Sequence, residues 1–170
     1  LVVGYNHSDD PNLKRLRYAD DDAMRYAAFF KHTTDHTVVL TEMDRETRRL
    51  MGKKHVGAPT RDGIIASLKQ IKHKMDAARA QGHTPILYFA YSSHGNYDAE
   101  GRGYVHLKGS RFTTRDLYYR LFNAFRRDSI ILIVDACNAA LLVNSRGVGK
   151  RRLARKSRLN LENYPNVGVI

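Results

Sequence analysis

The chain has 170 residues, of which 42% are hydrophobic and one, Cys137, is a cysteine. This length suits one domain with a buried core, and a single cysteine excludes an internal disulfide. No apolar run approaches the roughly 20 residues of a membrane span, and no signal-peptide pattern is present, so we expect a cytoplasmic protein without a membrane partner.

The formal net charge of +12 would suit a nucleic-acid partner if it were spread over one face. Seven of the 29 basic residues instead crowd into one stretch without an acid, here called the basic tract. Outside it, 22 basic residues face 17 acidic ones, a balance of +5, so nucleic-acid binding is not favoured. The seven are Arg146, Lys150, Arg151, Arg152, Arg155, Lys156 and Arg158.

Hydrophobic periodicity predicts strands and helices that alternate along the chain. Residues 86–91 and 130–134 are continuous apolar runs, typical of strands buried on both faces of a parallel sheet. Thr60 is a good N-cap for a long helix that stops at Gly82. The alternation predicts an α/β fold with a mostly parallel central sheet flanked by helices. The other predicted elements are strands at 1–4, 37–40, 104–107 and 167–170, and helices at 16–30, after Thr113 or Thr114, and from 137 to 143.

Two short polar motifs each follow one of the buried strands. Ser93-His94-Gly95 follows the first, and Asp135-Ala136-Cys137 follows the second. Carboxyl ends of parallel strands meet at one edge of a sheet, so His94 and Cys137 are predicted to lie side by side. An imidazole beside a thiol favours the nucleophilic thiolate, and the amides of Gly95 and Cys137 are candidates to hold an oxyanion. The alternative is an inert thiol and an ordinary loop histidine, which the matched placement disfavours.

These motifs resemble those of caspase-like cysteine peptidases of family C14, of the bacterial metacaspase or orthocaspase kind. Residues 16–23 resemble the Asp-Ala segment near the start of such domains, and residues 2–6 resemble their opening strand and turn. The similarity spans nearly the whole chain and corresponds to the large-subunit, p20-like part. It implies a caspase-like three-layer sandwich whose C-terminal strands are missing from this chain. It also implies His94 and Cys137 as the catalytic dyad, with Gly95 and Cys137 forming the oxyanion hole.

The resemblance further implies a preference for Arg or Lys before the scissile bond. Relatives with this preference carry an acid two positions before the cysteine, here Asp135, and a second acid best matched by Asp22. Two carboxylates in the base of a substrate (S1) pocket select a cation and repel an acid. The alternative for Asp22 is an acid on the helix surface, and Asp20 and Asp21 are predicted to be such surface acids.

The basic tract lies where relatives carry the linker between the large and small subunits. Residues 1–143 are therefore predicted to form the catalytic domain, 144–163 a basic linker, and 164–170 the start of the next strand. A run of Arg and Lys is a ready substrate for an enzyme that cuts after those residues, so its seven basic residues are autoprocessing candidates. A solvated charge run and a docking segment for a partner or nucleic acid are the alternatives.

No cofactor or metal site is predicted. Calcium activation, seen in some relatives, cannot be assigned because the acids at positions 9, 10, 98 and 100 form no recognisable ligand loop. The expected partners are protein or peptide substrates with basic residues, and the remaining p10-like small-subunit segment. A weakly active caspase-like scaffold and a nucleic-acid-binding module that uses the basic tract are the rival functions. The histidines without ligand spacing are His7, His32, His36, His55, His73, His83 and His106.

Overall fold

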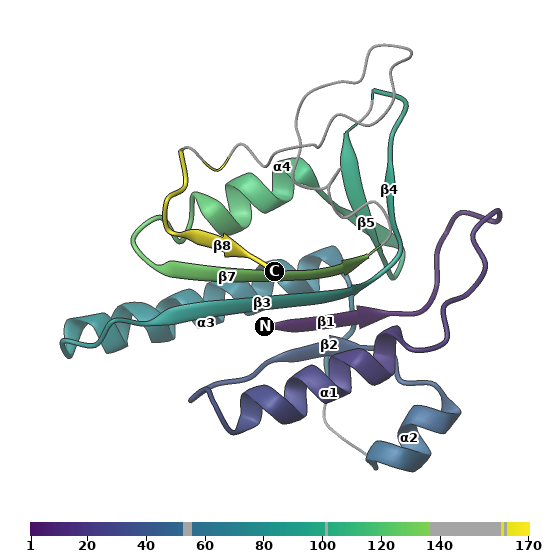
Figure 1. Cartoon of the computed structure of the whole chain (residues 1–170), viewed down its shortest axis with the longest axis horizontal. Helices are drawn as coiled ribbons and strands as arrows, with labels where there is room; N and C mark the ends of the chain where they lie inside the picture. The colour runs from purple at the N-terminus through teal and green to yellow at the C-terminus, as the bar shows by residue number, and fades with distance from the viewer. Residues whose placement is uncertain (53–55, 101, 137–160, 162) are drawn as a thin grey trace.

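A computed structural model of the chain describes residues 1–52, 56–100, 102–136, 161 and 163–170 (Figure 1). Its central sheet has five parallel strands in the order β2-β1-β3-β7-β8. Helices lie on both faces, which confirms the predicted α/β fold with a parallel sheet between helical layers. The five strands are β1 (Val2–Tyr5), β2 (Val39–Thr41), β3 (Ile86–Ser93), β7 (Ser129–Ala136) and β8 (Val167–Val169).

The two faces of the sheet are covered by different helices, as strand alternation requires. On one face, Val2 and Ala90 pack against Phe30 of α1 (Ala19–Lys31). The opposite face packs against α3 (Arg61–Ala80) and against the π-helical turn η1 (Leu117–Phe122), which continues α4 (Thr114–Asp116). Figure 1 shows α1 and α3 on opposite sides of the sheet. A short helix, α2 (Arg45–Met51), follows β2. No helix in the described part of the chain is long and apolar enough to cross a membrane.

A small antiparallel sheet rises from the carboxyl end of the central sheet (Figure 1). It consists of β4 (Gly95–Tyr97), β5 (Gly103–Leu107) and β6 (Ser110–Thr113), in that order. Phe112 of β6 stacks on Phe89 of β3, with ring centroids 6.2 Å apart, which joins the two sheets through the core. β3 of the central sheet ends directly before His94 and β4 of this sheet begins directly after it, so the chain is held on both sides of that residue.

The helix caps were predictable because they depend on neighbouring residues. Thr60 accepts a hydrogen bond from the Gly63 amide, and Gly82 takes the left-handed conformation with φ +87°. Thr113 forms a capping box with Asp116 at the start of α4. The predicted helix at 16–30 begins instead at Ala19, because the Ala19 amide donates to the side chain of Asn6, a partner outside the helix. The helix predicted from 137 lies outside the described residues.

Candidate active site

His94 lies between β3 and β4 with a single defined tautomer. Its Nε2 lies 2.8 Å from the carbonyl oxygen of Lys14, and its side chain is buried. A carbonyl oxygen only accepts, so Nε2 carries the proton and donates it to this bond. In the neutral form of this imidazole, Nδ1 is then the nitrogen with the lone pair, and it is the atom that can act as a general base. Lys14 belongs to the loop between β1 and α1, so the carboxyl end of β1 helps to orient a side chain that follows β3.

Gly95 places its amide on the outer edge of the small sheet, the side away from β5. The His106 amide donates to the His94 carbonyl oxygen at 3.0 Å, which makes His94 and His106 a hydrogen-bonded pair of the ladder. Antiparallel pairs alternate, so the next pair, Gly95 and Val105, is of the non-hydrogen-bonded kind. The Gly95 N–H therefore points away from β5. Since β4 is the edge strand of its sheet, this amide takes no part in the ladder among the described strands.

Asp22 and Asp135 come from distant parts of the chain and line the same cavity, of about 410 Å³. Asp22 lies in the first turns of α1, and Asp135 lies near the end of β7. Alternation puts Asp135 on the face of Ile133, which packs with α1, and the β3 residue paired with Asp135 is Ser92. The cavity is completed by Arg25, Tyr26 and Phe29 of α1.

The two carboxylates interact across this cavity. Burial raises the pKa of Asp22, and the charge of Asp135 raises it further. Arg25 and a hydrogen bond with the Ser92 side chain act in the opposite direction, since both favour the ionised form. Burial and the same two carboxylates also raise the pKa of the Tyr26 hydroxyl. The cavity is therefore a place where an added positive charge is electrostatically favoured.

The other two acids of α1 do not face this cavity. Asp20 was expected on the surface, and that prediction was wrong, because its side chain is fully buried. Its Oδ1 accepts from the Asn6 amide group, and its Oδ2 accepts from the Asp44 backbone N–H at 2.8 Å. Asp20 therefore ties α1 to the loops after β1 and β2. Asp21 is half-buried and accepts from the Thr47 hydroxyl at 3.1 Å.

His106 is a neighbour of His94 that sequence reasoning missed. It is 1% exposed, and its ring centroid lies 6.1 Å from that of His94. Its Nδ1 is 2.9 Å from the Ser8 hydroxyl, whereas its Nε2 has no hydrogen-bond partner among the residues that the structure describes. Burial lowers the pKa of His106, and the charges of His94 and Arg111 lower it further. A neutral imidazole therefore packs beside His94. No spacing in the sequence links His106 to His94, and a backbone acceptor such as the Lys14 carbonyl has no sequence signature at all.

The remaining predicted site residues lie outside the described residues. These are Cys137 and the seven basic residues of the tract, so the structure describes His94 without its expected partner. Within the described ranges, no three His, Asp or Glu side chains come close enough together to hold a metal ion. The acids of the loops at 9–10 and 98–100 therefore form no cluster of that kind.

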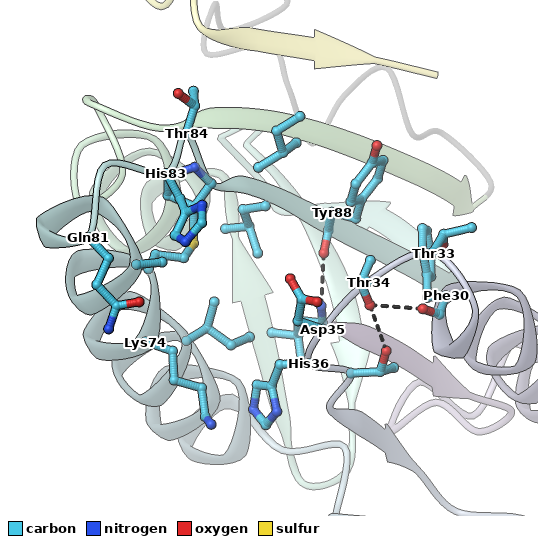
Figure 2. A pocket seen from close by; sticks show the side chains of 18 residues that line it. Phe30, Thr33, Thr34, Asp35, His36, Lys74, Gln81, His83, Thr84 and Tyr88 are labelled. Carbon is cyan, nitrogen blue, oxygen red and sulfur yellow. Dashed lines mark hydrogen bonds between the residues drawn. The ribbon is translucent and has the colours of Figure 1, made fainter.

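A larger cavity, of about 730 Å³, lies at the opposite end of the sheet (Figure 2). It is bordered by the C-terminal end of α1, the second half of α3 and the start of β3. Lys74, His36 and Thr34 are among its polar residues, and the Thr34 hydroxyl donates to the Phe30 carbonyl oxygen at 2.9 Å. Because this cavity lies at the amino ends of the strands, it is separate from the site around His94.

Two comparisons with known proteins bear on this site. A search of curated proteins found no match. The family model described as the caspase domain, Peptidase_C14, matches residues 1–164, which is nearly the whole chain. The five-stranded parallel sheet between helices agrees with that fold. The chain therefore belongs to the caspase-domain family of peptidases.

Proposed function

We propose that this protein is a cysteine endopeptidase that cleaves peptide bonds after Arg or Lys. Membership of the caspase-domain family supports peptidase chemistry in general. The observation that carries the proposed specificity is the meeting of Asp22 and Asp135 in one cavity. The orientation of His94 by the Lys14 carbonyl supports its role as the base.

In the proposed reaction, Nδ1 of His94 takes the proton of the Cys137 thiol, and the sulfur attacks the carbonyl carbon before the scissile bond. The Gly95 amide donates to the oxygen that becomes negative in this step. Collapse of the intermediate breaks the C–N bond, and His94 gives its proton to the departing amine. Water then attacks the thioester with His94 as the base, which releases the acid product and restores the thiol.

The side chain before the scissile bond is proposed to enter the cavity between α1 and β7. A Lys or Arg side chain there would lie near the carboxylates of Asp22 and Asp135, with the Ser92 hydroxyl as a further polar neighbour. Charge-assisted hydrogen bonds to a carboxylate contribute about 1.5–3 kcal/mol, which corresponds to roughly ten- to hundredfold in binding. An Asp side chain would be repelled by both carboxylates.

Three peptides that differ only in the residue before a fluorescent leaving group, Arg, Lys or Asp, test this proposal. The wild type should release the dye from the Arg and Lys peptides, and Cys137→Ala should release none. Asp135→Asn should lower kcat/KM for the Arg peptide by about tenfold or more, because one carboxylate is lost. Asp35→Asn, which removes an exposed acid beside the opposite cavity, is the matched control and should keep wild-type values.

Cleavage of the Asp peptide alone would contradict the assigned specificity. Cleavage of no peptide, with no labelling of Cys137 by a thiol-directed acyl probe, would contradict the enzymatic function.

A further inference from the structure

We infer that Arg25 competes with the substrate's basic side chain for Asp22 and thereby weakens substrate binding in the pocket. This inference rests on the proposed function, because it concerns the same cavity. It assigns to Arg25 a role in substrate affinity that is opposite in sign to that of the carboxylates around it.

Arg25 lies one helical turn after Asp22 on α1, so both side chains project from the same side of the helix. Its Nη1 is 3.7 Å from the Asp22 Oδ1 atom, and Arg25 lines the cavity together with Asp135. The group that Arg25 presents to Asp22 is a guanidinium, which is also the group that a substrate arginine would bring. In the free protein, Arg25 therefore presents to Asp22 the same chemical group that a substrate arginine would present.

The charges in the cavity make the two guanidinium groups rivals. Of the five described residues that line it, Asp22 and Asp135 are acidic and Arg25 is basic. A substrate cation that reaches Asp22 meets a carboxylate already partly neutralised, and it also meets the like charge of Arg25. Either Arg25 swings away or the substrate binds Asp22 less closely, and both outcomes reduce affinity.

The strength of this competition is limited by the exposure of Arg25. Its side chain is 73% exposed, and exposed ion pairs contribute little because solvent screens them and the long side chain loses conformational freedom. Arg25 can therefore leave Asp22 without disturbing the fold. The competition should alter substrate affinity by about two- to fivefold and should leave the chemical step unchanged.

An opposite role for Arg25 would give the opposite result. Arg25 favours the ionised form of Asp22, against the effects of burial and of Asp135. If that were its main contribution, removing Arg25 would leave Asp22 more often protonated and would weaken the binding of a basic side chain. The sign of the change in KM therefore distinguishes the two roles.

The test compares Arg25→Gln with the wild type on the Arg peptide at neutral pH and fixed ionic strength. We expect KM to fall by about two- to fivefold with kcat unchanged. The inhibition constant of agmatine, a small guanidinium compound without a scissile bond, should fall by the same factor. Arg25→Lys keeps the charge and should stay near the wild type. Lys31→Gln removes one charge from the last turn of the same helix and controls for net charge.

The outcomes separate this inference from the proposed function. A KM that is unchanged or raised in Arg25→Gln, with a wild type that cuts the Arg peptide, would reject the competition and leave the specificity in place. An equal fall in Lys31→Gln would also reject it, because the effect would then follow from net charge. A wild type that cuts neither basic peptide would reject the proposed function and this inference with it.

Discussion

At the scale of single residues, the two carboxylates of the pocket differ in how deeply they are buried. Asp22 is half-buried on α1, whereas Asp135 is exposed near the end of β7. Burial raises the pKa of Asp22, and the negative charge of Asp135 raises it further. A basic side chain between the two would stabilise the ionised form of Asp22. Substrate binding and the ionisation of Asp22 are thus coupled.

This coupling predicts an acid limb in the pH dependence of KM for the Arg peptide. The groups that face Asp22 are Asp21 and Arg25 on α1, Asp135 on β7 and Ser92 on β3, and their net effect with burial is a raised pKa. KM should be lowest above that pKa and should rise as the pH falls through it, because protonated Asp22 no longer attracts a cation.

Asp22→Asn tests the origin of this limb. The variant should raise KM by about tenfold or more at neutral pH, since it lacks a charged hydrogen-bond acceptor. It should also remove this acid limb, because the carboxyl group whose titration produces the limb is absent. Asp21→Asn, a change at the neighbouring acid, should retain the limb. An unaltered limb in Asp22→Asn, measured from initial rates across the pH range, would assign the titration to another group.

At the scale of elements, the position of Asp22 depends on how closely α1 approaches β1. A Cβ atom at Gly4 would lie 2.3 Å from the Ala19 carbonyl oxygen and 2.5 Å from the Ala23 Cβ atom. Both are fixed parts of α1, so neither can rotate away. The absence of a side chain at Gly4 therefore allows the contact between strand and helix that places Asp22 near Asp135.

Gly4→Ala should consequently push α1 away from the sheet. We expect a loss of about 1–3 kcal/mol in the free energy of unfolding, which is typical of overpacked cores, together with a raised KM for the Arg peptide. Urea denaturation and initial rates measure the two effects. Gly57→Ala is the matched comparison, because its added Cβ would meet the flexible end of Leu40 at 2.6 Å, and its loss should be smaller. Equal losses in the two variants would contradict the role given to Gly4.

The sequence could predict those elements whose stabilising partners lie close to them along the chain, and it failed where the partners are distant in sequence. Thr60 and Thr113 cap their helices through residues three positions away, and the apolar runs of β3 and β7 are visible as such. The start of α1 depends on Asn6, 13 residues before Ala19, and periodicity alone placed it too early. The burial of Asp20 depends on Asn6 and on the Asp44 amide, so composition made it look like a surface acid.

At the scale of the whole molecule, the sheet determines how much of the site could be predicted. Parallel strands that end at one edge bring His94, Asp135 and the turn of α1 with Asp22 to the same end of the fold, which motif order anticipates. Lys14 contributes only its backbone carbonyl, and His106 reaches His94 through the register of β4 and β5. Neither contact leaves a pattern in the sequence, because each depends on where the chain runs after folding.

The charge of the whole molecule leads to the last prediction. Seven of its basic residues lie in the tract at 146–158, which is chemically a substrate for an enzyme that cuts after Arg or Lys. We expect the purified wild-type chain to be cut after one or more of these residues, and Cys137→Ala to stay intact. Mass spectrometry of the fragments should find new C-termini at Arg or Lys within the tract.

Two further samples separate self-cleavage from its alternatives. A variant with all seven basic residues of the tract changed to Gln should remain uncut while it still cleaves the Arg peptide, because its pocket is unaltered. Intact Cys137→Ala mixed with a small amount of wild type should be cut at the same positions if one molecule can process another. If the wild type stays intact while it cleaves the Arg peptide, the tract is not its own substrate. Salt-sensitive DNA binding that disappears in the Gln variant would then identify the tract as a nucleic-acid contact.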